Sequence, residues 1–221
     1  MAASETPLLP PDATREEVCA FFRLDDAACA RLALHVDELR RWNARMNLVA
    51  PSTMPQVWTR HVADGLQLLA HLPRDARQVI DLGSGSGVPG LVLALAAPER
   101  ACFTLVESNH RKAAFLRQVA QQAGIAINMM AARIEALDAA ALAVDNQAVL
   151  VARALAPLPR LLALAEPFWQ AGARALLLKG REAAREMEEA RKAGWQFDSR
   201  AYRSMTDHEG QVLLLQEVRR G

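Results

Sequence analysis

The sequence predicts an α/β protein built on a mostly parallel sheet. Apolar stretches of strand length alternate with helical patterns from Arg77 onward. A run of alternating glycines follows the first of these stretches, as in a strand-to-helix turn. The last two stretches have no helical pattern between them, which predicts an antiparallel hairpin at the end of the sheet. We therefore expect seven strands, with a helical region in front of them.

The first third of the chain carries helical patterns and no strand pattern. We expect residues 1–75 to form an N-terminal helical region and residues 76–221 to form the domain that holds the sheet. Residues Met1 to Pro11 are expected to form a disordered tail, followed by N-cap candidates at Asp12-Ala13-Thr14. The helices expected here cover Arg15–Phe22, a stretch beginning at Leu24-Asp25-Asp26, and Gln56–His71.

The remainder alternates between the two patterns. The expected strands are Gln78–Leu82, Cys102–Val106, Ile127–Met130, Ala148–Ala152, Arg174–Lys179, Gln196–Tyr202 and Gln211–Val218. The expected helices are Val88–Ala97, His110–Ala123, Leu158–Trp169 and Ala183–Ala193. The stretch Asp207-His208-Glu209-Gly210 provides the turn of the final hairpin.

The first expected strand runs into Val79-Ile80-Asp81-Leu82-Gly83-Ser84-Gly85-Ser86-Gly87-Val88-Pro89-Gly90. Glycines permit a sharp turn, positive φ and a close approach of a ligand to the backbone. Pro89 suits the first turn of a helix, where its missing N–H is no loss. This order of strand, glycine loop and helix directs free N–H groups at a ligand above the carboxyl ends of parallel strands.

The glycine loop fits two kinds of cofactor. Gly85 to Gly90 matches the G-x-G-x-x-G fingerprint of dinucleotide sites, which on its own is a weak signal. Asp81 favours a different ligand, since a carboxylate would repel a pyrophosphate but could accept from a cationic amino group. S-adenosylmethionine has an amino-acid tail and no phosphate. An NAD-dependent oxidoreductase remains the alternative.

Further candidate ligands follow the later strands. Glu107 comes about twenty residues after the loop, where an acid can accept from two ribose hydroxyls. Ile134 could cover an adenine face while the backbone at Ile134 and Glu135 bonds its edge, although the same residues could simply begin a surface helix. Arg153 closes the fourth strand and could pair with a carboxylate of the cofactor, a nucleobase or a phosphate.

Basic residues form several short clusters. Arg60-His61, Arg111-Lys112 and Lys179 would make a phosphate-binding rim if the fold brought them together, although each cluster alone is most often a solvated surface. His61 could act as a base, but a structural histidine is the more common role of such a residue.

The composition limits the possible classes of protein. The net charge of +1 over 221 residues does not indicate a strongly basic nucleic-acid binder, so any such contact must come from a local patch. The three cysteines, an odd number without metal-ligand spacing, favour a reduced cytoplasmic compartment. No signal peptide, bilayer-spanning apolar run or metal-ligand cluster is evident in the sequence.

The motifs taken together resemble the bacterial 16S ribosomal RNA guanine-N7 methyltransferases of the glucose-inhibited-division B family. The resemblance extends from about Trp42 to Leu215, and the combination and order of its parts are specific. Those parts are Trp42-Asn43, Asn47-Leu48, Arg60-His61, the stretch Asp81–Leu91, Glu107-Ser108, Arg111-Lys112, Phe115-Leu116-Arg117, Arg133-Ile134-Glu135, Arg153-Ala154 and Leu178-Lys179-Gly180.

The resemblance implies a Rossmann-like class I methyltransferase fold, S-adenosylmethionine as cofactor, and methyl transfer to N7 of a guanine in the decoding-region loop of 16S rRNA. The substrate is expected to be 16S rRNA or the small ribosomal subunit, and the protein a cytoplasmic monomer without membrane or metal partners. The expected cofactor-binding residues are Asp81, Gly83, Gly85, Gly87, Val88, Glu107, Ile134, Glu135 and Arg153. The expected RNA-binding residues are Arg60, His61, Arg111, Lys112 and Lys179, and Arg153, Lys179 and His61 are candidates for positioning the reactants.

The sequence departs from the family pattern at three places. Glu107 stands where the family usually has aspartate, Val88 where it has leucine or phenylalanine, and Gln211 where it often has a basic residue. The lack of an obvious general base agrees with the reaction, because N7 of guanine carries an exposed lone pair and positioning can suffice. A non-catalytic RNA-binding or ribosome-assembly factor with the same fold is a second alternative.

Overall fold

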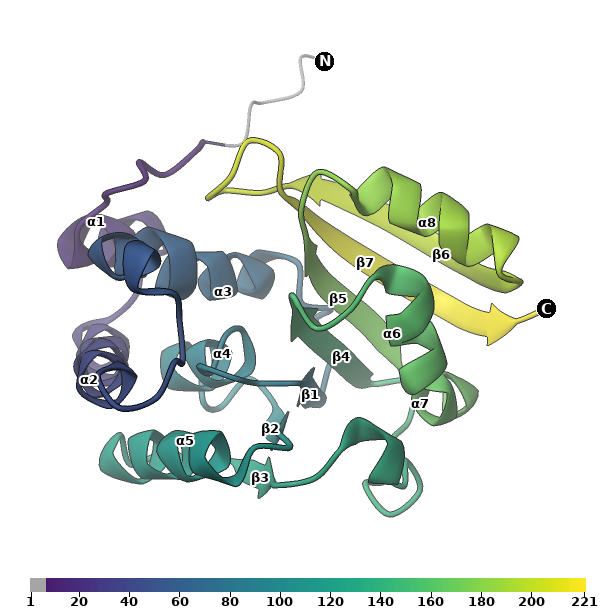
Figure 1. Ribbon diagram of the computed structural model, residues 1–221, viewed down its shortest axis with the longest axis horizontal. Helices are drawn as coiled ribbons and strands as arrows, with labels where there is room; N and C mark the ends of the chain where they lie inside the picture. The colour runs from purple at the N-terminus through teal and green to yellow at the C-terminus, as the bar shows by residue number, and fades with distance from the viewer. Residues whose placement is uncertain (1–6) are drawn as a thin grey trace.

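A seven-stranded sheet forms the centre of the computed structural model, which describes residues 7–221 (Figure 1). The strand order is β3-β2-β1-β4-β5-β7-β6, with the first five strands parallel and both pairings of β7 antiparallel. The strands are β1 Gln78–Leu82, β2 Cys102–Val106, β3 Asn128–Met130, β4 Ala148–Arg153, β5 Arg174–Lys179, β6 Trp195–Arg203 and β7 Gln211–Arg220. The predicted fold class and the C-terminal hairpin are confirmed.

The α-helices are α1 Arg15–Phe21, α2 Asp26–Asn43, α3 Asp64–Leu66, α4 Gly90–Ala96, α5 His110–Gln122, α6 Leu158–Leu164, α7 Glu166–Gln170 and α8 Ala183–Lys192. Shorter helical turns are η1 Pro51–Gln56, η2 Trp58–Ala63, η3 Gln67–Ala70 and η4 Ile134–Ala136. The expected helix Gln56–His71 is thus a series of short segments of different pitch. The expected helix Leu158–Trp169 is divided at Ala165, because Pro167 has no N–H to donate to the preceding turn.

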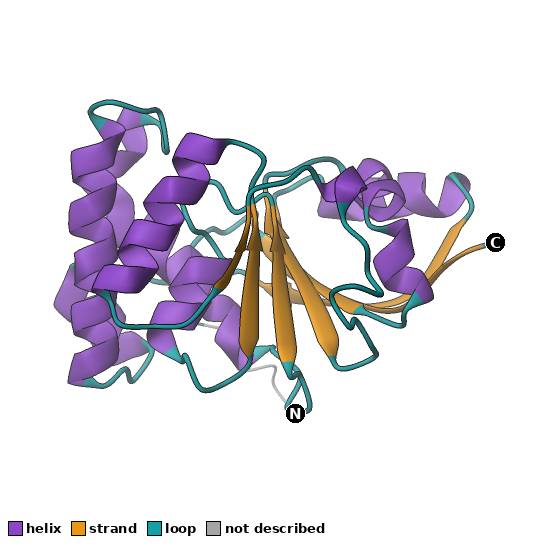
Figure 2. Ribbon diagram, turned by 90° about the horizontal axis from the view of Figure 1, so that it is seen from below, coloured by secondary structure: helices purple, strands orange, loops and turns teal. Residues whose placement is uncertain are grey.

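Side chains alternate between the two faces of the sheet and so belong to two different cores. In β1, Val79 packs in the core below α4 and η3, whereas Ile80 packs with α6 and α7 on the other face. Figure 2 shows the sheet between these two helical layers. Leu32 and Leu39 of α2 share an apolar core with α4 and α5, so the N-terminal helices are part of one of these layers.

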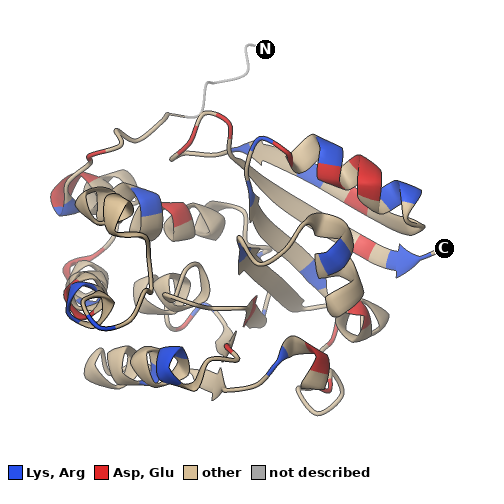
Figure 3. Cartoon of the chain, in the orientation of Figure 1, with Lys and Arg blue, Asp and Glu red and all other residues tan. Residues whose placement is uncertain are grey.

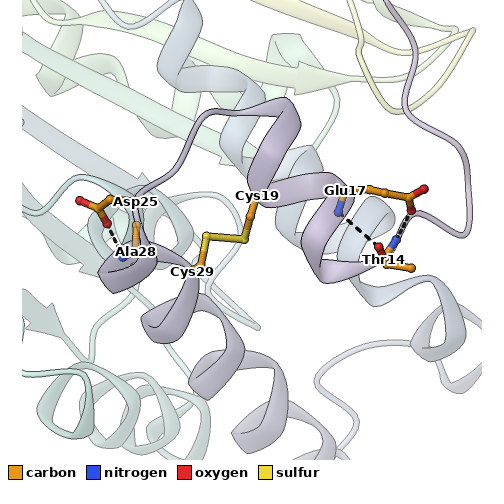
Figure 4. The surroundings of a disulfide bond; sticks show 6 residues. All are labelled: Thr14, Glu17, Cys19, Asp25, Ala28 and Cys29. Atoms are coloured by element: carbon orange, nitrogen blue, oxygen red, sulfur yellow. Dashed lines mark hydrogen bonds between the residues drawn. A yellow bond between two sulfur atoms is a disulfide. The ribbon is translucent and has the colours of Figure 1, made fainter.

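Two features of the N-terminal segment differ from expectation. Leu9 is buried and its N–H donates to the carbonyl of Met205 at 2.8 Å, so the expected tail is ordered from this point; residues 1–6 lie outside the described residues. Cys19 and Cys29 form a disulfide across the turn between α1 and α2, with Cα atoms 6.1 Å apart (Figure 4). The odd cysteine count gave no sign of this pair, which depends on how two neighbouring helices meet. Cys102 is free.

The ends of these helices follow their sequence signals. Thr14 caps α1, and Glu17 returns a hydrogen bond to the N–H of Thr14, which makes a reciprocal capping box (Figure 4). Asp25 caps α2 by accepting from the N–H of Ala28. Within residues 7–221, no helix combines the length and the apolar character that crossing a bilayer requires.

Candidate active site

The glycine loop between β1 and α4 lies at the carboxyl ends of the parallel strands. Gly83 and Gly85 have φ values of +73° and +53°, which residues with a Cβ atom rarely adopt. The N–H groups of Gly83 and Ser84 both donate to the carbonyl of Val106, so the loop is fixed to the end of β2. A Cβ on Gly85 would meet only the carbonyl of Gly83, at 3.8 Å. One side of the loop is therefore bare backbone facing open space.

Glu107 joins this loop to the start of α5. Its Oε2 accepts from the N–H of Gly85 at 2.9 Å and its Oε1 accepts from the N–H of Asn109 at 2.8 Å. Each carboxylate oxygen can accept a further bond, because a carboxylate offers about four acceptor sites. The carboxylate is thus fixed in place and still has acceptor capacity for a ligand.

A cavity of about 400 Å³ opens beside the loop and Glu107. Its walls contain apolar groups, two acidic residues and several basic groups, a mixture typical of small-molecule sites. The lining residues used below are Gly83, Gly85, Glu107, Lys112, Ile134, Glu135, Arg153, Ala154, Leu155, Ala156 and Arg160. Six expected cofactor-binding residues, Gly83, Gly85, Glu107, Ile134, Glu135 and Arg153, therefore surround one space.

Asp81 lies elsewhere. Its side chain projects from the face of β1 that α4 covers, is fully buried, and accepts from the N–H of Gly90 at 3.1 Å through Oδ2. Its Oδ1 has no hydrogen-bond partner among the described residues. Burial raises the pKa of Asp81 to about 7. The carboxyl group thus fixes the start of α4, and its expected contact with a cationic amino group gains no support.

Gly87 and Val88 also lie behind the loop. Gly87 has a φ of +93°, and a Cβ there would lie 2.9 Å from Cβ of Leu91. Val88 is buried in the core formed with the N-terminal helices. Neither residue lines the cavity, so the arrangement gives them a packing role rather than the expected cofactor contact.

Arg153 connects β4 with the N-terminal helices. Its Nη1 donates to Oδ2 of Asp64 at 3.0 Å and to the carbonyl of Arg60 at 2.8 Å. Its Nη2 lies 2.9 Å from Nδ1 of His61. These contacts hold the guanidinium over the end of β4 in one orientation, at the rim of the cavity.

The partners of His61 assign its tautomer. The hydroxyl of Thr53 donates to the carbonyl of Ala50 and lies 2.9 Å from Nε2 of His61. Nε2 therefore carries the proton and Nδ1 accepts from Arg153. Burial, followed by the charge of Arg153, lowers the pKa of His61 to about 3. His61 is buried and neutral, and both ring nitrogens are engaged within the protein.

A second cavity, of about 500 Å³, lies over the ends of β4, β5 and β7. It shares Arg153, Ala154, Leu155 and Ala156 with the first cavity. Lys179 lies in its wall, where Nζ donates to Oε2 of Glu186 at 2.7 Å and to the carbonyl of Ala156 at 2.9 Å. Lys179 is therefore a component of this wall and not an exposed phosphate contact.

The other expected RNA-binding residues occupy different surfaces. Arg60 is about half exposed and lies 3.8 Å from the carboxylate of Asp207, near the second cavity. Arg111 is exposed in the first turn of α5, and Lys112 beside it lines the first cavity. Basic and acidic residues alternate along α8 instead of forming a basic patch (Figure 3). The expected rim is thus divided between the two sides of the site.

Sequence reasoning missed three residues that shape the site. Asp64 carries the ion pair with Arg153, and its position one helical turn after Arg60 could have indicated it. Glu186 pairs with Lys179 across the loop after β5. His35 of α2 reaches the glycine loop, where Nε2 lies 2.8 Å from the carbonyl of Ser86. No local pattern identifies Glu186 or His35, because both act through long-range packing.

The sheet order, the glycine loop and the cavity at the carboxyl ends of β1, β2 and β4 define a Rossmann-like class I methyltransferase fold. Solved structures with this fold are similar, although at low identity. The O-methyltransferase TomG from Streptomyces achromogenes matches with a TM-score of 0.53 at 17% identity, covering 87% of this chain and 90% of that one. An O-methyltransferase from Bacillus cereus matches with a TM-score of 0.51 at 13% identity, covering 82% and 90%.

The family follows from the sequence match. Residues 28–214 match the model of the GidB family, described as rRNA small subunit methyltransferase G, and the chain belongs to this family. Curated relatives carry the name ribosomal RNA small subunit methyltransferase G. The relative from Dinoroseobacter shibae is 44% identical, covering 87% of this chain and 98% of its own. The relative from Rhodopseudomonas palustris is 40% identical, covering 100% and 95%.

Proposed function

We propose that this protein transfers a methyl group from S-adenosylmethionine to N7 of a guanine in 16S ribosomal RNA. The observation that carries the proposal is the Glu107 carboxylate, held between Gly85 and Asn109 at the edge of a cavity above the parallel strands. Family membership supports the reaction and the class of substrate, because relatives that match nearly the whole chain are named for small-subunit rRNA methylation.

The cavity residues fit an adenosine with an amino-acid tail. Glu107 retains acceptor capacity for two ribose hydroxyls, and the nearly buried side chain of Ile134 offers an apolar surface for an adenine ring. The Cβ-free face at Gly85 leaves room beside the sugar, which a side chain would fill. The basic group of Arg160 suits the carboxylate of the tail. Glu135 at the rim and Arg153 at the end of β4 complete the proposed cofactor-binding site.

The chemistry requires alignment and not proton removal. The bound cofactor supplies a methyl group on a sulfonium, so the new N–C bond forms as the C–S bond breaks and no proton leaves the base. The protein's task is to hold the guanine in line and to exclude water. The state of His61 agrees with a reaction that needs no general base. Both of its ring nitrogens are hydrogen-bonded within the protein, and its pKa of about 3 leaves it neutral.

Arg153 is proposed as a positioning residue. It lines both cavities, and Asp64, His61 and the carbonyl of Arg60 fix its guanidinium between them. A planar cation held in this way can orient a carboxylate or the oxygen of a base without moving during the reaction. The charge then contributes to transition-state alignment without a cost of reorganisation.

We further propose that residues 1–75 form the N-terminal helical region, that residues 76–221 form the methyltransferase domain, and that the N-terminal region helps to bind RNA. Arg60 supports this role because it is exposed beside the second cavity. Arg111 and Lys112 offer phosphate contacts on the other side of the first cavity. A cytoplasmic monomer acting on 16S rRNA or on the small ribosomal subunit completes the proposal.

Methyl transfer to a substrate that lacks the modification tests the function. Small-subunit rRNA and small subunits from cells without the enzyme are incubated with tritiated S-adenosylmethionine, and the labelled base is then mapped. We expect one labelled guanine, methylated at N7 and located in the decoding-region loop. Label at another atom or another base would overturn the assignment.

Binding and thermal-stability measurements beside this assay separate the alternatives. A non-catalytic assembly factor would bind the RNA without transferring label. A dinucleotide enzyme would gain thermal stability from NADH and none from S-adenosylhomocysteine. We expect the opposite pattern, because the relatives that match nearly the whole chain are named as methyltransferases.

A further inference from the structure

The second cavity contains an ion pair that the proposed function leaves unexplained. Lys179 ends β5 and Glu186 lies in the first turns of α8, and their side chains are only 9% and 18% exposed. An ion pair withdrawn from water costs free energy unless further hydrogen bonds compensate. Lys179 gains one from the carbonyl of Ala156, and Glu186 gains one from the N–H of Leu158 at 2.8 Å. The pair thus ties α8 to the segment that lines both cavities.

The pair retains unused hydrogen-bonding capacity. The bonds from Lys179 and Leu158 both go to Oε2 of Glu186, whereas Oε1 carries none of the hydrogen bonds found within residues 7–221. Nζ of Lys179 donates twice and has a third N–H. The free Oε1, which can accept two hydrogen bonds, and one N–H of Lys179 are therefore available at the wall of a cavity of about 500 Å³.

The segment Arg153–Ala156, which lines both cavities, has an unusual backbone conformation. Ala154 has a φ of +51°, an unusual conformation for a residue with a side chain, and such strain is concentrated at functional sites. The side chain of Leu155 then lies against the glycine loop, so closely that a Cβ on Gly83 would be 2.8 Å from Cδ1 of Leu155. Both cavities are lined by this segment, so ligands in the two cavities would lie next to each other beside it.

We propose that the second cavity receives the target guanine, with Oε1 of Glu186 accepting from its N1–H and N2 amino groups and Lys179 donating to O6. Two neighbouring donors followed by an acceptor are the pattern that this acid and this cation can satisfy together. Adenine presents an acceptor at N1 and would leave the carboxylate unpaired. With its Watson–Crick edge on α8, the base turns N7 away from Glu186 and toward Arg153–Ala156. This inference rests on the proposed function and adds the part of the site that selects the base.

Inosine tests the inference, since it differs from guanosine only by the missing N2 amino group. Small-subunit rRNA is assembled by ligation with guanosine or inosine at the target position. Methyl transfer is measured as kcat/KM, and affinity is measured with S-adenosylhomocysteine present so that no transfer occurs. We expect the wild-type protein to prefer the guanosine substrate about tenfold or more, as one lost hydrogen bond to a charged group predicts.

The variant Glu186→Gln tests the residue, and Glu188→Gln is the matched control. Glu188 lies two residues further along α8, exposed and paired with Lys192. We expect Glu186→Gln to reduce the preference to within about twofold of unity and Glu188→Gln to retain the wild-type ratio. S-adenosylhomocysteine affinity should stay unchanged in both variants, because neither residue lines the first cavity.

The outcomes are distinguishable. If the wild-type protein methylates no guanine of this RNA, the proposed function itself fails. If it methylates guanosine and inosine equally, or if Glu186→Gln keeps the full preference, only the assignment of the guanine site is overturned. Should Glu186→Gln fail to fold, which its thermal melt would reveal, equal methylation of guanosine and inosine by the wild-type protein would still overturn the assignment.

Discussion

His35 donates from Nε2 to the carbonyl of Ser86 at 2.8 Å, although the two residues lie 51 positions apart. The imidazole is fully buried, and burial lowers its pKa to about 4, so it bonds as a neutral donor. This contact joins α2 directly to the glycine loop. The N-terminal helices therefore help to shape the proposed cofactor-binding site, in addition to covering the sheet.

Removing this contact should loosen the glycine loop. We expect His35→Leu to lower the free energy of unfolding by about 1–3 kcal/mol, because the buried carbonyl of Ser86 loses its donor. S-adenosylhomocysteine should also bind more weakly by calorimetry. His71→Leu is a suitable control, since His71 stacks on Tyr202 away from the loop. Equal affinity of His35→Leu and the wild-type protein would contradict this link.

The pH dependence of stability follows from three buried groups. The pKa values of His35 and His61, about 4 and about 3, lie below the ordinary 6.5, so the unfolded chain binds two protons that the folded chain does not. Their contribution to stability is therefore lost as the pH falls below 6.5. The pKa of Asp81, raised to about 7 from 3.8, has the opposite effect, because the folded chain binds this proton first.

The net difference among these three groups is about one proton, and the half-buried His71, whose pKa burial also lowers, acts in the same direction as the other histidines. We therefore expect the free energy of unfolding to fall by roughly 1.4 kcal/mol per pH unit between pH 6 and pH 5. Urea unfolding at each pH measures this slope. His35→Gln removes one of the histidine contributions and should give a slope near zero. A variant slope as steep as that of the wild-type protein would contradict the role of His35.

The loop glycine at position 85 can be tested with a variant that introduces a side chain and a charge. Gly85→Asp should abolish S-adenosylhomocysteine binding, because the new carboxylate would lie beside Glu107 and in the space left for the ligand. Gly124→Asp is the matched control, since Gly124 also has a positive φ and a Cβ there would meet nothing within 4 Å. Calorimetry should show normal binding for the control. Wild-type affinity in Gly85→Asp would remove the loop from the site.

Arg174 provides a matched control for Arg153, at the opposite end of the parallel strands. Arg153 and Arg174 each form an ion pair with an aspartate at 3.0 Å, but Arg174 begins β5 and Arg153 ends β4. We expect both alanine variants to lose stability, and only Arg153→Ala to lose methyl transfer, by roughly a hundredfold as for a misplaced reactant. A similar loss of activity in both variants would show that the effect is structural.

Arg111 is proposed to contact phosphate. Arg111→Gln should weaken RNA binding uniformly and lower the slope of log affinity against log salt concentration by about 1. Lys192→Gln on α8, where Lys192 pairs with Glu188, should leave the slope unchanged. Identical slopes for Arg111→Gln and the wild-type protein would exclude Arg111 from the interface.

The parts of the fold with local sequence signals were the most predictable. The strands from β1 to β5 and the final hairpin follow from apolar stretches and turn residues, and Glu107 follows from its place after β2. Asp81 shows where such reasoning ends. Its position next to the loop suggested a ligand contact, but strand alternation turns its side chain toward α4 and Gly90.

Contacts between distant segments could not be predicted from spacing. The bond from His35 to Ser86 and the ion pair between Asp64 and Arg153 join segments 51 and 89 residues apart. Both depend on how the N-terminal helices pack on the sheet, which the helical patterns alone do not specify. Lys179 was expected to contact a phosphate, because the sequence did not reveal that it pairs with Glu186.

A crystal structure of the protein with S-adenosylhomocysteine tests the proposed cofactor-binding site most directly. We predict that both ribose hydroxyls lie within hydrogen-bond distance of the Glu107 carboxylate, with the adenine against Ile134 and the sulfur facing the segment Arg153–Ala156. A ligand that occupies the other cavity, or one whose ribose makes no contact with Glu107, would contradict the account.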